Sequence, residues 1–178
     1  MSTGVLGAVL AGGRSRRFGS DKAAALLDGR PLLDHVVEAL LPQVDAIVVC
    51  GRHHGSLPSL VDRPVPDLGP LGGLNAALHH AAAHGFELVL TAGCDMPGFR
   101  SNVLATLAGH QPAVLLGQQI VGLWPAALAP RLDAYLASAT DRSMRAWMRH
   151  VGAHEVPFGS MMANVNSPAD LERLAGGA

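Results

Sequence analysis

A loop rich in glycine and arginine follows the first apolar run of the chain. The stretch LAGGRSRRFGSDK, residues 10–22, interleaves small and cationic residues: Gly12, Gly13, Gly19, Arg14, Arg16 and Arg17. Glycine lets the backbone approach a ligand closely, so N–H groups and cations can meet the same small anion. Phosphate is the usual anion at such loops. The loop therefore predicts phosphate binding directly after a strand.

This loop lacks both common nucleotide fingerprints. A P-loop needs lysine immediately after Gly19, whereas Lys22 comes three residues later, and GxGxxG does not allow the adjacent Gly12 and Gly13. Lys22 is nevertheless the single lysine among thirteen basic residues. A compact ammonium meets phosphate as a point charge. We therefore expect Lys22 to bind phosphate, the alternative being an ordinary charged surface turn.

A second loop, PDLGPLGGLNAA at residues 66–77, combines prolines and glycines before an alanine-rich helix. Such a stiff backbone can lie against a flat base or a ribose, where side chains would obstruct. Asp67 could accept a hydrogen bond from a ribose hydroxyl, a base N–H or a metal-bound water. A plain loop with a capping aspartate remains the alternative.

A third loop, AGCDMPGF at residues 92–99, places Asp95 after a buried apolar run and before a proline. Mg²⁺ bound beside phosphates takes only one or two protein carboxylates and keeps several waters. Asp95 fits that role. Cys94 beside it is expected to be a small packed residue, because no neighbour in the sequence would activate its thiol.

The remaining candidate site residues have simpler structural interpretations. His79, His80 and His84 share one helix, but with no carboxylate or third ligand beside them we expect solvent-facing side chains and no metal site. Asn164 and Asn166 precede a helix and could order a loop or read a heterocycle. Three arginines at helical spacing would form a solvated face or meet an anionic second substrate: Arg142, Arg145 and Arg149. Near them, Met144, Trp147 and Met148 are expected to make contacts in the core or at its rim and not to form a cofactor site.

Short apolar runs alternate with helical patterns along the chain. Strands are expected at residues 5–10, 46–50, 63–67, 86–93, 154–158, and in 113–124 as two strands around a turn at Gly117–Gln118. Helices are expected at residues 32–43, 72–85 closed by Gly85, 101–110 with Ser101 as N-cap, 125–138, 141–152, and 167–175 with Ser167 as N-cap and Pro168 first. This alternation predicts a mostly parallel sheet covered by helices on both faces. Ligands then bind at the carboxyl ends of the strands.

The composition limits the possible classes. The 178 residues are 49% hydrophobic and 15% charged, which predicts a single folded domain over residues 1–178. A net charge of −1 argues against a broad nucleic-acid-binding face. The N-terminal apolar run is too short for a membrane span and lacks the cationic start of a signal peptide. Two cysteines are too few for a disulfide framework. We therefore expect a cytoplasmic protein.

Four motifs in this order and spacing resemble the molybdenum cofactor guanylyltransferases of the nucleotidyltransferase-like α/β fold: LAGGRSRRFGSDKA, PDLGPLGGL, CDMP and NVNSPADL. The resemblance runs from about Val5 to Leu171. It implies a three-layer α/β/α Rossmann-like fold with a mostly parallel sheet. It also implies Mg²⁺-dependent transfer of GMP from GTP to the phosphate of molybdopterin, with release of pyrophosphate.

The resemblance further implies which residues act. Lys22, Arg16 and Asp95 would be catalytic, with Asp95 holding Mg²⁺. The substrates would be bound by Leu10, Ala11, Gly12, Gly13, Arg17, Lys22, Asp67, Gly69, Pro70, Leu71, Gly72, Asn164 and Asn166. Two positions depart from the family: Cys50 stands where asparagine often lies near the base, and the segment 117–124 is shorter than the usual His-Pro or Gln-Pro stretch.

The expected partners are GTP and molybdopterin, with transient contact to molybdoenzymes or cofactor chaperones and none with nucleic acid or membrane. Two alternatives stay open. One is a cytidylyltransferase or sugar-phosphate nucleotidyltransferase of the same fold. The other is a non-catalytic nucleotide-binding module that carries the cofactor.

Overall fold

The computed structural model describes residues 4–12, 25–159, 162–165 and 167–175. Within them, a seven-stranded sheet has the order β5-β4-β1-β6-β8-β7-β9. Its strands are β1 (Val5–Leu10), β4 (Ala46–Cys50), β5 (Ser59–Leu60), β6 (Leu88–Gly93), β7 (Ala113–Leu115), β8 (Gln118–Pro125) and β9 (His154–Val156). A separate two-stranded sheet pairs β2 (Leu26–Leu27) with β3 (Arg30–Pro31).

The large sheet is mostly parallel, as the sequence predicts. β5, β4, β1 and β6 pair in parallel, β8 is antiparallel to both of its neighbours, and β7 and β9 pair in parallel. Because β8 is the reversed strand in the described part of the chain, it begins at the edge of the sheet where β1, β4 and β6 end. That edge therefore gathers the carboxyl ends of the six other strands and the start of β8.

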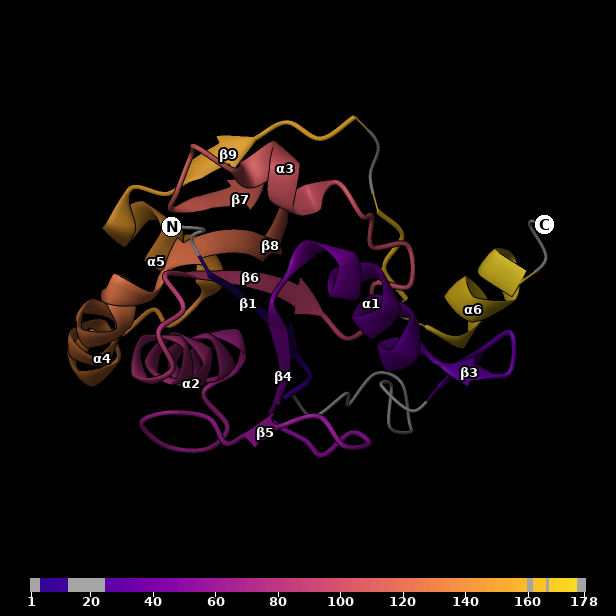
Figure 1. The fold of residues 1–178 in the computed structure, drawn as a ribbon, viewed down its shortest axis with the longest axis horizontal. Helices are drawn as coiled ribbons and strands as arrows, with labels where there is room; N and C mark the ends of the chain where they lie inside the picture. The colour runs from indigo at the N-terminus through magenta and orange to yellow at the C-terminus, as the bar shows by residue number, and fades with distance from the viewer. Residues whose placement is uncertain (1–3, 13–24, 160–161, 166, 176–178) are drawn as a thin grey trace.

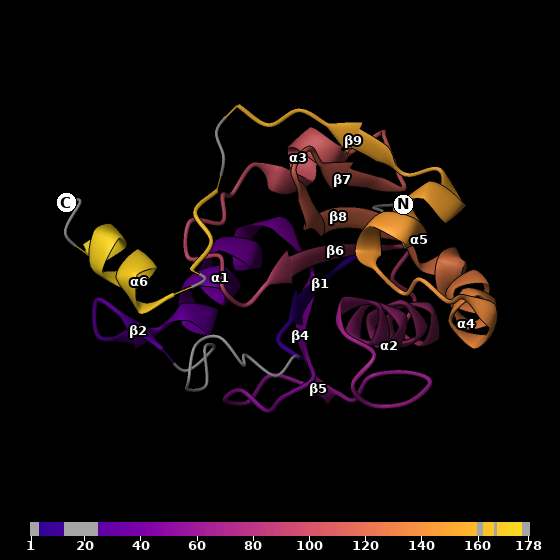
Figure 2. The ribbon, with the colours of Figure 1, turned by 180° about the vertical axis from the view of Figure 1, so that it is seen from behind.

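Helices cover both faces of the sheet (Figures 1 and 2). The helices of the described residues are α1 (Leu32–Leu40), α2 (Pro70–Ala83), α3 (Val103–Leu107), α4 (Ala129–Ser138), α5 (Met144–Val151) and α6 (Pro168–Ala175), with short 3₁₀ turns at Leu41–Gln43 and Ala126–Leu128. None of the helices in the described residues is long and apolar enough to cross a lipid bilayer.

Two hydrophobic cores follow from the alternation of side chains along β1. Leu6, Ala8 and Leu10 face the core shared with α2, α4 and α5. Val5 and Val9 face the core shared with α1 and α3. Figure 1 shows α1 in front of the sheet, and Figure 2 brings α5 to the front. The three-layer α/β/α architecture is thus confirmed, with Met144, Trp147 and Met148 in the core as expected.

The strand expected at residues 63–67 is absent. The strand that pairs with β4 lies at Ser59–Leu60, and residues 63–67 form bends and a turn instead. Pro64 and Pro66 have no N–H to donate to a neighbouring strand, which explains why pairing stops before them. The turn between β7 and β8 falls on Leu116–Gly117, one residue earlier than predicted, where Gly117 has φ +77°.

The helix ends test the predicted caps. Ser167 accepts from the Asp170 N–H and Asp170 accepts from the Ser167 N–H, so the predicted cap of α6 is confirmed. Gly85 follows the end of α2 with φ +78°, also as predicted. The predicted cap at Ser101 is wrong. α3 begins two residues later, and the side-chain oxygen of Gln43 accepts from an α3 backbone N–H at 2.9 Å.

α6 lies apart from the large sheet. It packs with the β2–β3 hairpin through a small core of Leu27, Leu32 and Val165. In both views this lobe stands at one end of the long axis, beside the C-terminus (Figures 1 and 2). Its attachment through Val165 brings the C-terminal segment back to the edge where β6 ends.

Candidate functional site

Two of the predicted loops, those after β1 and β6, leave the sheet side by side with the loop that follows β4. Leu10 at the end of β1 is paired with Cys50 on β4 and with Gly93 on β6. Two hydrogen bonds continue these ladders past the strand ends, from the Ala11 N–H to the Cys50 carbonyl (2.9 Å) and from the Cys94 N–H to the Leu10 carbonyl (3.3 Å). The loops after β1, β4 and β6 are therefore neighbours.

The described part of the glycine-arginine loop ends at Gly12. Four predicted residues of this loop, Gly13, Arg16, Arg17 and Lys22, lie outside the described residues. Gly12 packs against Gly51, where a Cβ would lie 2.5 Å from the Gly12 Cα. Gly51 also has φ +88°, so glycine is required there on two grounds. This contact brings the loops after β1 and β4 into backbone contact.

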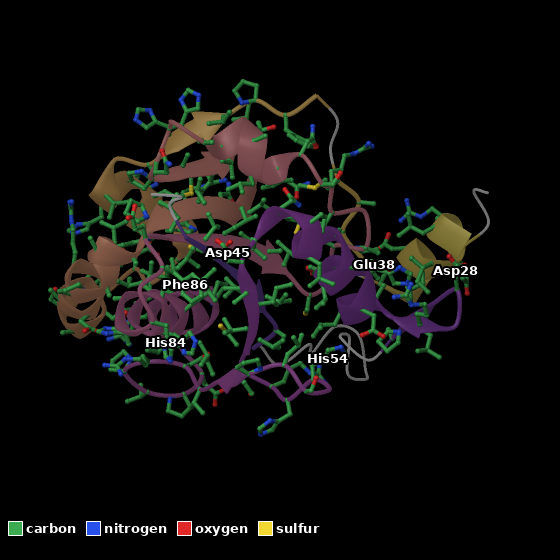
Figure 3. All side chains as sticks on the ribbon, viewed as in Figure 1. Asp28, Glu38, Asp45, His54, His84 and Phe86 are labelled. Atoms are coloured by element: carbon green, nitrogen blue, oxygen red, sulfur yellow. The ribbon has the colours of Figure 1, made fainter. Side chains whose placement is uncertain are left out.

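A cavity of about 240 Å³ opens beside this contact. Its walls are Gly12, Gly51, Arg52, His53, Ser59, Leu60, Val61, Asp62, Pro66 and Asp67. The Ser59 hydroxyl donates to the Arg52 carbonyl at 2.8 Å and fixes the wall that follows β4. Further along the same wall, His54 (labelled in Figure 3) lies with its Nε2 2.6 Å from Asp34 Oδ1, which ties the wall to α1. The cavity thus has braced walls that carry both hydrogen-bond donors and carboxylates.

Asp62 is the site residue that sequence reasoning missed. Its Oδ1 is buried without a hydrogen-bond partner. Burial foremost, and then the negative charge of Asp67, raises the pKa of Asp62 above its ordinary value, although the Leu68 N–H partly offsets both. The side chain lies against the start of α2, because a Cβ on Gly72 would come within 2.9 Å of three Asp62 atoms. The Gly72–Gly73 pair is the sequence signal that could have pointed to Asp62, since paired glycines inside a helix indicate that another part of the chain lies close to the helix backbone.

The predicted second loop also lies at this cavity. Asp67 lines it and has φ +63°, and Gly69 precedes α2 with φ +67°. α2 begins at Pro70, two residues before the predicted start, with proline in its first turn. The side chains of Leu10 and Leu71 are buried in the core, so only their backbone groups are available to a ligand.

Asp95 and Asn164 are brought to the opposite side of β1. Asp95 follows β6, and Gly93 makes room for its carboxylate, because a Cβ there would lie 2.7 Å from Asp95 Oδ1. The Val165 N–H donates to the Asp95 carbonyl at 2.9 Å, which places exposed Asn164 next to this loop. Asn166 lies outside the described residues.

The two cysteines differ in exposure, and Cys50 is too buried to act as a nucleophile. Cys50 is 1% exposed and packs beneath Gly73, and burial raises the pKa of its thiol to about 12. It therefore cannot reach a ligand at the cavity, although its backbone carbonyl holds Ala11. Cys94 is half-buried and packs against the α1 and α3 core, as expected.

The histidine prediction is partly wrong. His79 is not simply solvent-facing, since its Nε2 lies 2.8 Å from Asp133 Oδ2 on α4. This carboxylate comes from a helix more than fifty residues away, so local spacing could not reveal it. His80 and His84 stack on each other with ring centroids 4.0 Å apart. Across the described residues, no group of three or more His, Cys, Asp or Glu side chains could hold a metal ion.

Comparison with known proteins gives the family. A model of the MobA-like NTP transferase domain matches residues 7–156. A molybdenum cofactor guanylyltransferase from Sinorhizobium fredii (strain NBRC 101917 / NGR234) is 39% identical, over 92% of this chain and 87% of that protein. Another from Rhodobacter capsulatus is 37% identical, over 95% of this chain and 94% of that protein.

The fold has solved counterparts. The crystal structure of molybdopterin-guanine dinucleotide biosynthesis protein A from Archaeoglobus fulgidus aligns with a TM-score of 0.75 and 22% identity, over 96% of this chain and 97% of that chain. This likeness supports the nucleotidyltransferase fold, and the family follows from the domain match and the closer sequence relatives. The chain therefore belongs to the MobA-like NTP transferase family and is a nucleotidyltransferase of molybdenum cofactor biosynthesis.

Proposed function

We propose that this protein transfers GMP from GTP to the phosphate of molybdopterin, forming molybdopterin guanine dinucleotide and pyrophosphate. The observation that carries the proposal is the meeting of three loops at one sheet edge, with a polar cavity on one side of β1 and Asp95 on the other. The guanylyltransferase relatives support the same donor and acceptor.

The reaction exchanges one phosphate linkage for another. An oxygen of the molybdopterin phosphate attacks the α-phosphorus of GTP, and the bond from that phosphorus to the oxygen bridging to the β-phosphate breaks. The electron pair leaves with pyrophosphate. The attacking phosphate is already ionised at neutral pH, so no general base is needed. The protein therefore has to align two polyanions and offset their charge.

The cations of the glycine-arginine loop suit the leaving group. Lys22 and Arg16 would offset the charge that develops on pyrophosphate, with Arg17 beside them. Gly12 and Gly13 would bring backbone N–H groups to the phosphates. These roles rest on the sequence motif, since of these residues only Gly12 is among the described ones.

Asp95 fits a Mg²⁺ ligand. Its carboxylate stands at the strand end in space that the missing side chain of Gly93 leaves open. One carboxylate suffices for a Mg²⁺ ion that is otherwise held by phosphate oxygens and water. When bound, the ion would offset the negative charge of the substrate phosphates. Asp95 would thereby fix where the α-phosphate lies.

The cavity beside β4 suits the guanine nucleoside. Guanine presents the acceptors O6 and N7 and also N–H donors. Arg52 and His53 offer hydrogen-bond donors for O6 and N7. Asp62 and Asp67 offer acceptors for the N–H groups of the base. Buried Cys50 cannot replace the family's asparagine as a reader of the base. We therefore propose that these four side chains share the recognition of the base and ribose.

Thermal unfolding with and without Mg²⁺, in the presence of GTP, CTP, ATP or UTP, tests the donor. Binding to the folded state alone raises the apparent melting temperature. We expect the largest increase with GTP and Mg²⁺, and a much smaller one for Lys22→Ala. A larger increase with CTP would move the protein to the cytidylyl alternative. GTP binding without pyrophosphate release from molybdopterin and GTP would favour the carrier alternative.

The remaining expectations follow from the same proposal. Transient contacts with molybdoenzymes or cofactor chaperones would deliver the product. A cytoplasmic location would give access to GTP and molybdopterin.

A further inference from the structure

The reversed strand β8 begins with a buried amide at the catalytic edge. Thr91 on β6 is paired with Gly122 on β8, so the ladder runs toward Gln118 on the same side as Asp95. Gln118 is only 9% exposed. Its Nε2 donates to the Met162 carbonyl at 2.9 Å in a fully buried hydrogen bond. Its Oε1 is buried without a hydrogen-bond partner.

The acceptor of this hydrogen bond belongs to a short extended segment, Met162–Val165, which we call the strap. Gln118 holds the Met162 end, and the Asp95 carbonyl holds the Val165 N–H at 2.9 Å. Between these points the backbone runs close to Gly98, where a Cβ would lie 3.4 Å from the Ala163 nitrogen. The strap is thus fastened to β8 and to the loop that carries Asp95.

The side chains at the two ends of the strap are buried, and the two side chains between them are exposed. Met162 is buried in the core beneath α1 and α3, and Val165 is buried in the small core with Leu27 and Leu32. Ala163 and Asn164 between them are exposed. The two buried ends and the two hydrogen bonds therefore fix the position at which Asn164 meets solvent beside Asp95.

The sheet order separates this strap from the nucleotide cavity. The cavity lies over β5, β4 and β1, whereas Gln118 and the strap lie over β6 and β8. Asp95, at the end of β6, stands between them. A group transferred at Asp95 would therefore reach its acceptor from the side of the strap, since the donor nucleotide fills the other side.

We propose that Gln118 is a positioning residue for the acceptor substrate, which holds the strap so that Asn164 can bind the pterin-bearing phosphate compound. This inference rests on the proposed function for the identity of the acceptor. Without the Gln118 donor, the Met162 carbonyl loses its buried partner and the strap shifts from its position. The nucleotide cavity shares no wall residue with this contact.

The test compares Gln118→Met, which keeps the length of the side chain but removes the donor, with Gln119→Met at the half-buried neighbouring position. Pyrophosphate release gives KM values for molybdopterin and for GTP and a kcat for each protein. For Gln118→Met we expect the KM for molybdopterin to rise about tenfold while the KM for GTP stays within about twofold. Gln119→Met should leave both values unchanged.

Two further variants and a direct binding measurement complete the design. In Gln118→Glu a carboxylate would face the Met162 carbonyl, and Gln118→His, whose ring N–H can donate, should recover part of the lost affinity. Equilibrium dialysis of molybdopterin alone measures acceptor binding without turnover. If molybdopterin binding depends on Gln118 but the wild-type protein releases no pyrophosphate, the transferase proposal is wrong and the inference stands.

Two results would overturn the inference. The first is a Gln118→Met protein that binds molybdopterin as tightly as the wild type. The second is an equal rise in both KM values together with a lower melting temperature, which would mean that the hydrogen bond serves stability alone. Failure of wild-type binding to molybdopterin would remove the inference and the acceptor assignment together.

Discussion

A buried carboxylate oxygen without a partner makes Asp62 the least satisfied group of the nucleotide cavity. The neighbours of Asp62 explain why this oxygen has no partner. Asp67 adds negative charge, and the glycines of α2 supply no side-chain donor. A ligand hydroxyl or N–H would satisfy this oxygen. At the scale of the residue, the free protein keeps a buried Asp62 oxygen without a hydrogen bond, and a bound substrate can supply that hydrogen bond.

Asp62→Asn should therefore stabilise the free protein and weaken GTP binding. The pKa of Asp62 is raised in the folded state, so ionisation destabilises the fold as pH rises through the ordinary pKa toward the raised one. At pH 7 the variant should melt higher than the wild type, and this difference should shrink at about pH 3, where both states are protonated.

Thermal melts at both pH values, with and without GTP, check this prediction. The variant should also show a smaller increase of melting temperature with GTP and Mg²⁺ than the wild type. A variant that melts lower at pH 7 and still responds fully to GTP would contradict the role given to Asp62.

The start of α2 sets the distance between this carboxylate and the sheet. Gly72 faces Asp62, whereas Gly73 faces Cys50 and Leu10, with a virtual Cβ at 3.1 and 3.2 Å from their atoms. Two adjacent glycines thus have different tasks. One allows the loop after β5 to lie on the helix, and the other lets the helix lie on the ends of β1 and β4.

Gly72→Ala and Gly73→Ala should separate these tasks. Alanine favours a helix by about 1 kcal/mol over glycine, so neither change weakens α2 itself. Gly72→Ala should displace Asp62 and raise the Kd for GTP about tenfold with a small change in melting temperature. Gly73→Ala should mainly lower the melting temperature by overpacking the core. Calorimetric titration with GTP and thermal melts measure the two effects, and identical behaviour of the variants would reject the distinction.

The local sequence pattern predicts the strands and helices well, but not the distant residues that contact them. The apolar runs identify β1 and β4 because a strand buried on both faces reads as continuous hydrophobic sequence. The cap of α3 could not be predicted, since Gln43 supplies it from sixty-one residues away. Likewise the sequence indicates an aspartate near the second loop but draws attention to Asp67, because the burial of Asp62 depends on the packing of α2. Tertiary contact, not spacing, decides both cases.

At the scale of the whole molecule, α2 and α4 are joined at a polar contact on the face away from α1. Asp133 accepts from Asn75 Nδ2 at 2.7 Å and lies 2.8 Å from His79 Nε2. Burial works to raise the pKa of Asp133, but the hydrogen bonds from Asn75 and His79 and the charges of His79 and Arg63 outweigh it, so this pKa is lowered. The charged form of Asp133 therefore stabilises the packing of the two helices.

Asp133→Asn should remove a pH-dependent part of the stability. Because the pKa is lowered in the folded state, the stabilisation is present above the ordinary pKa and is lost as pH falls through the folded value. We expect the variant to lose about 0.5–1 kcal/mol at pH 7, given the partial exposure of the pair. This difference should be smaller near pH 3, which lies below the ordinary pKa and nearer to the lowered folded one.

Urea unfolding at the two pH values measures the effect of this variant. Glu172→Gln, an exposed change on α6, is the matched control and should show no such pH dependence. A loss of stability in Asp133→Asn that is equal at both pH values would mean that packing, not charge, joins the helices.

The reversed direction of β8 has a consequence for how enzymes of this design can diversify. The loops proposed to bind the donor nucleotide all precede Asp95 in the chain, and the contacts proposed for the acceptor all follow it, because β8 comes from the later half of the chain and begins at the edge where β6 ends. On this proposal, the residues that select the donor nucleotide and those that select the acceptor are encoded in separate stretches of one gene. A recombination after the end of β6 could give such an enzyme a new acceptor specificity while leaving the part of the chain that is proposed to bind GTP unchanged.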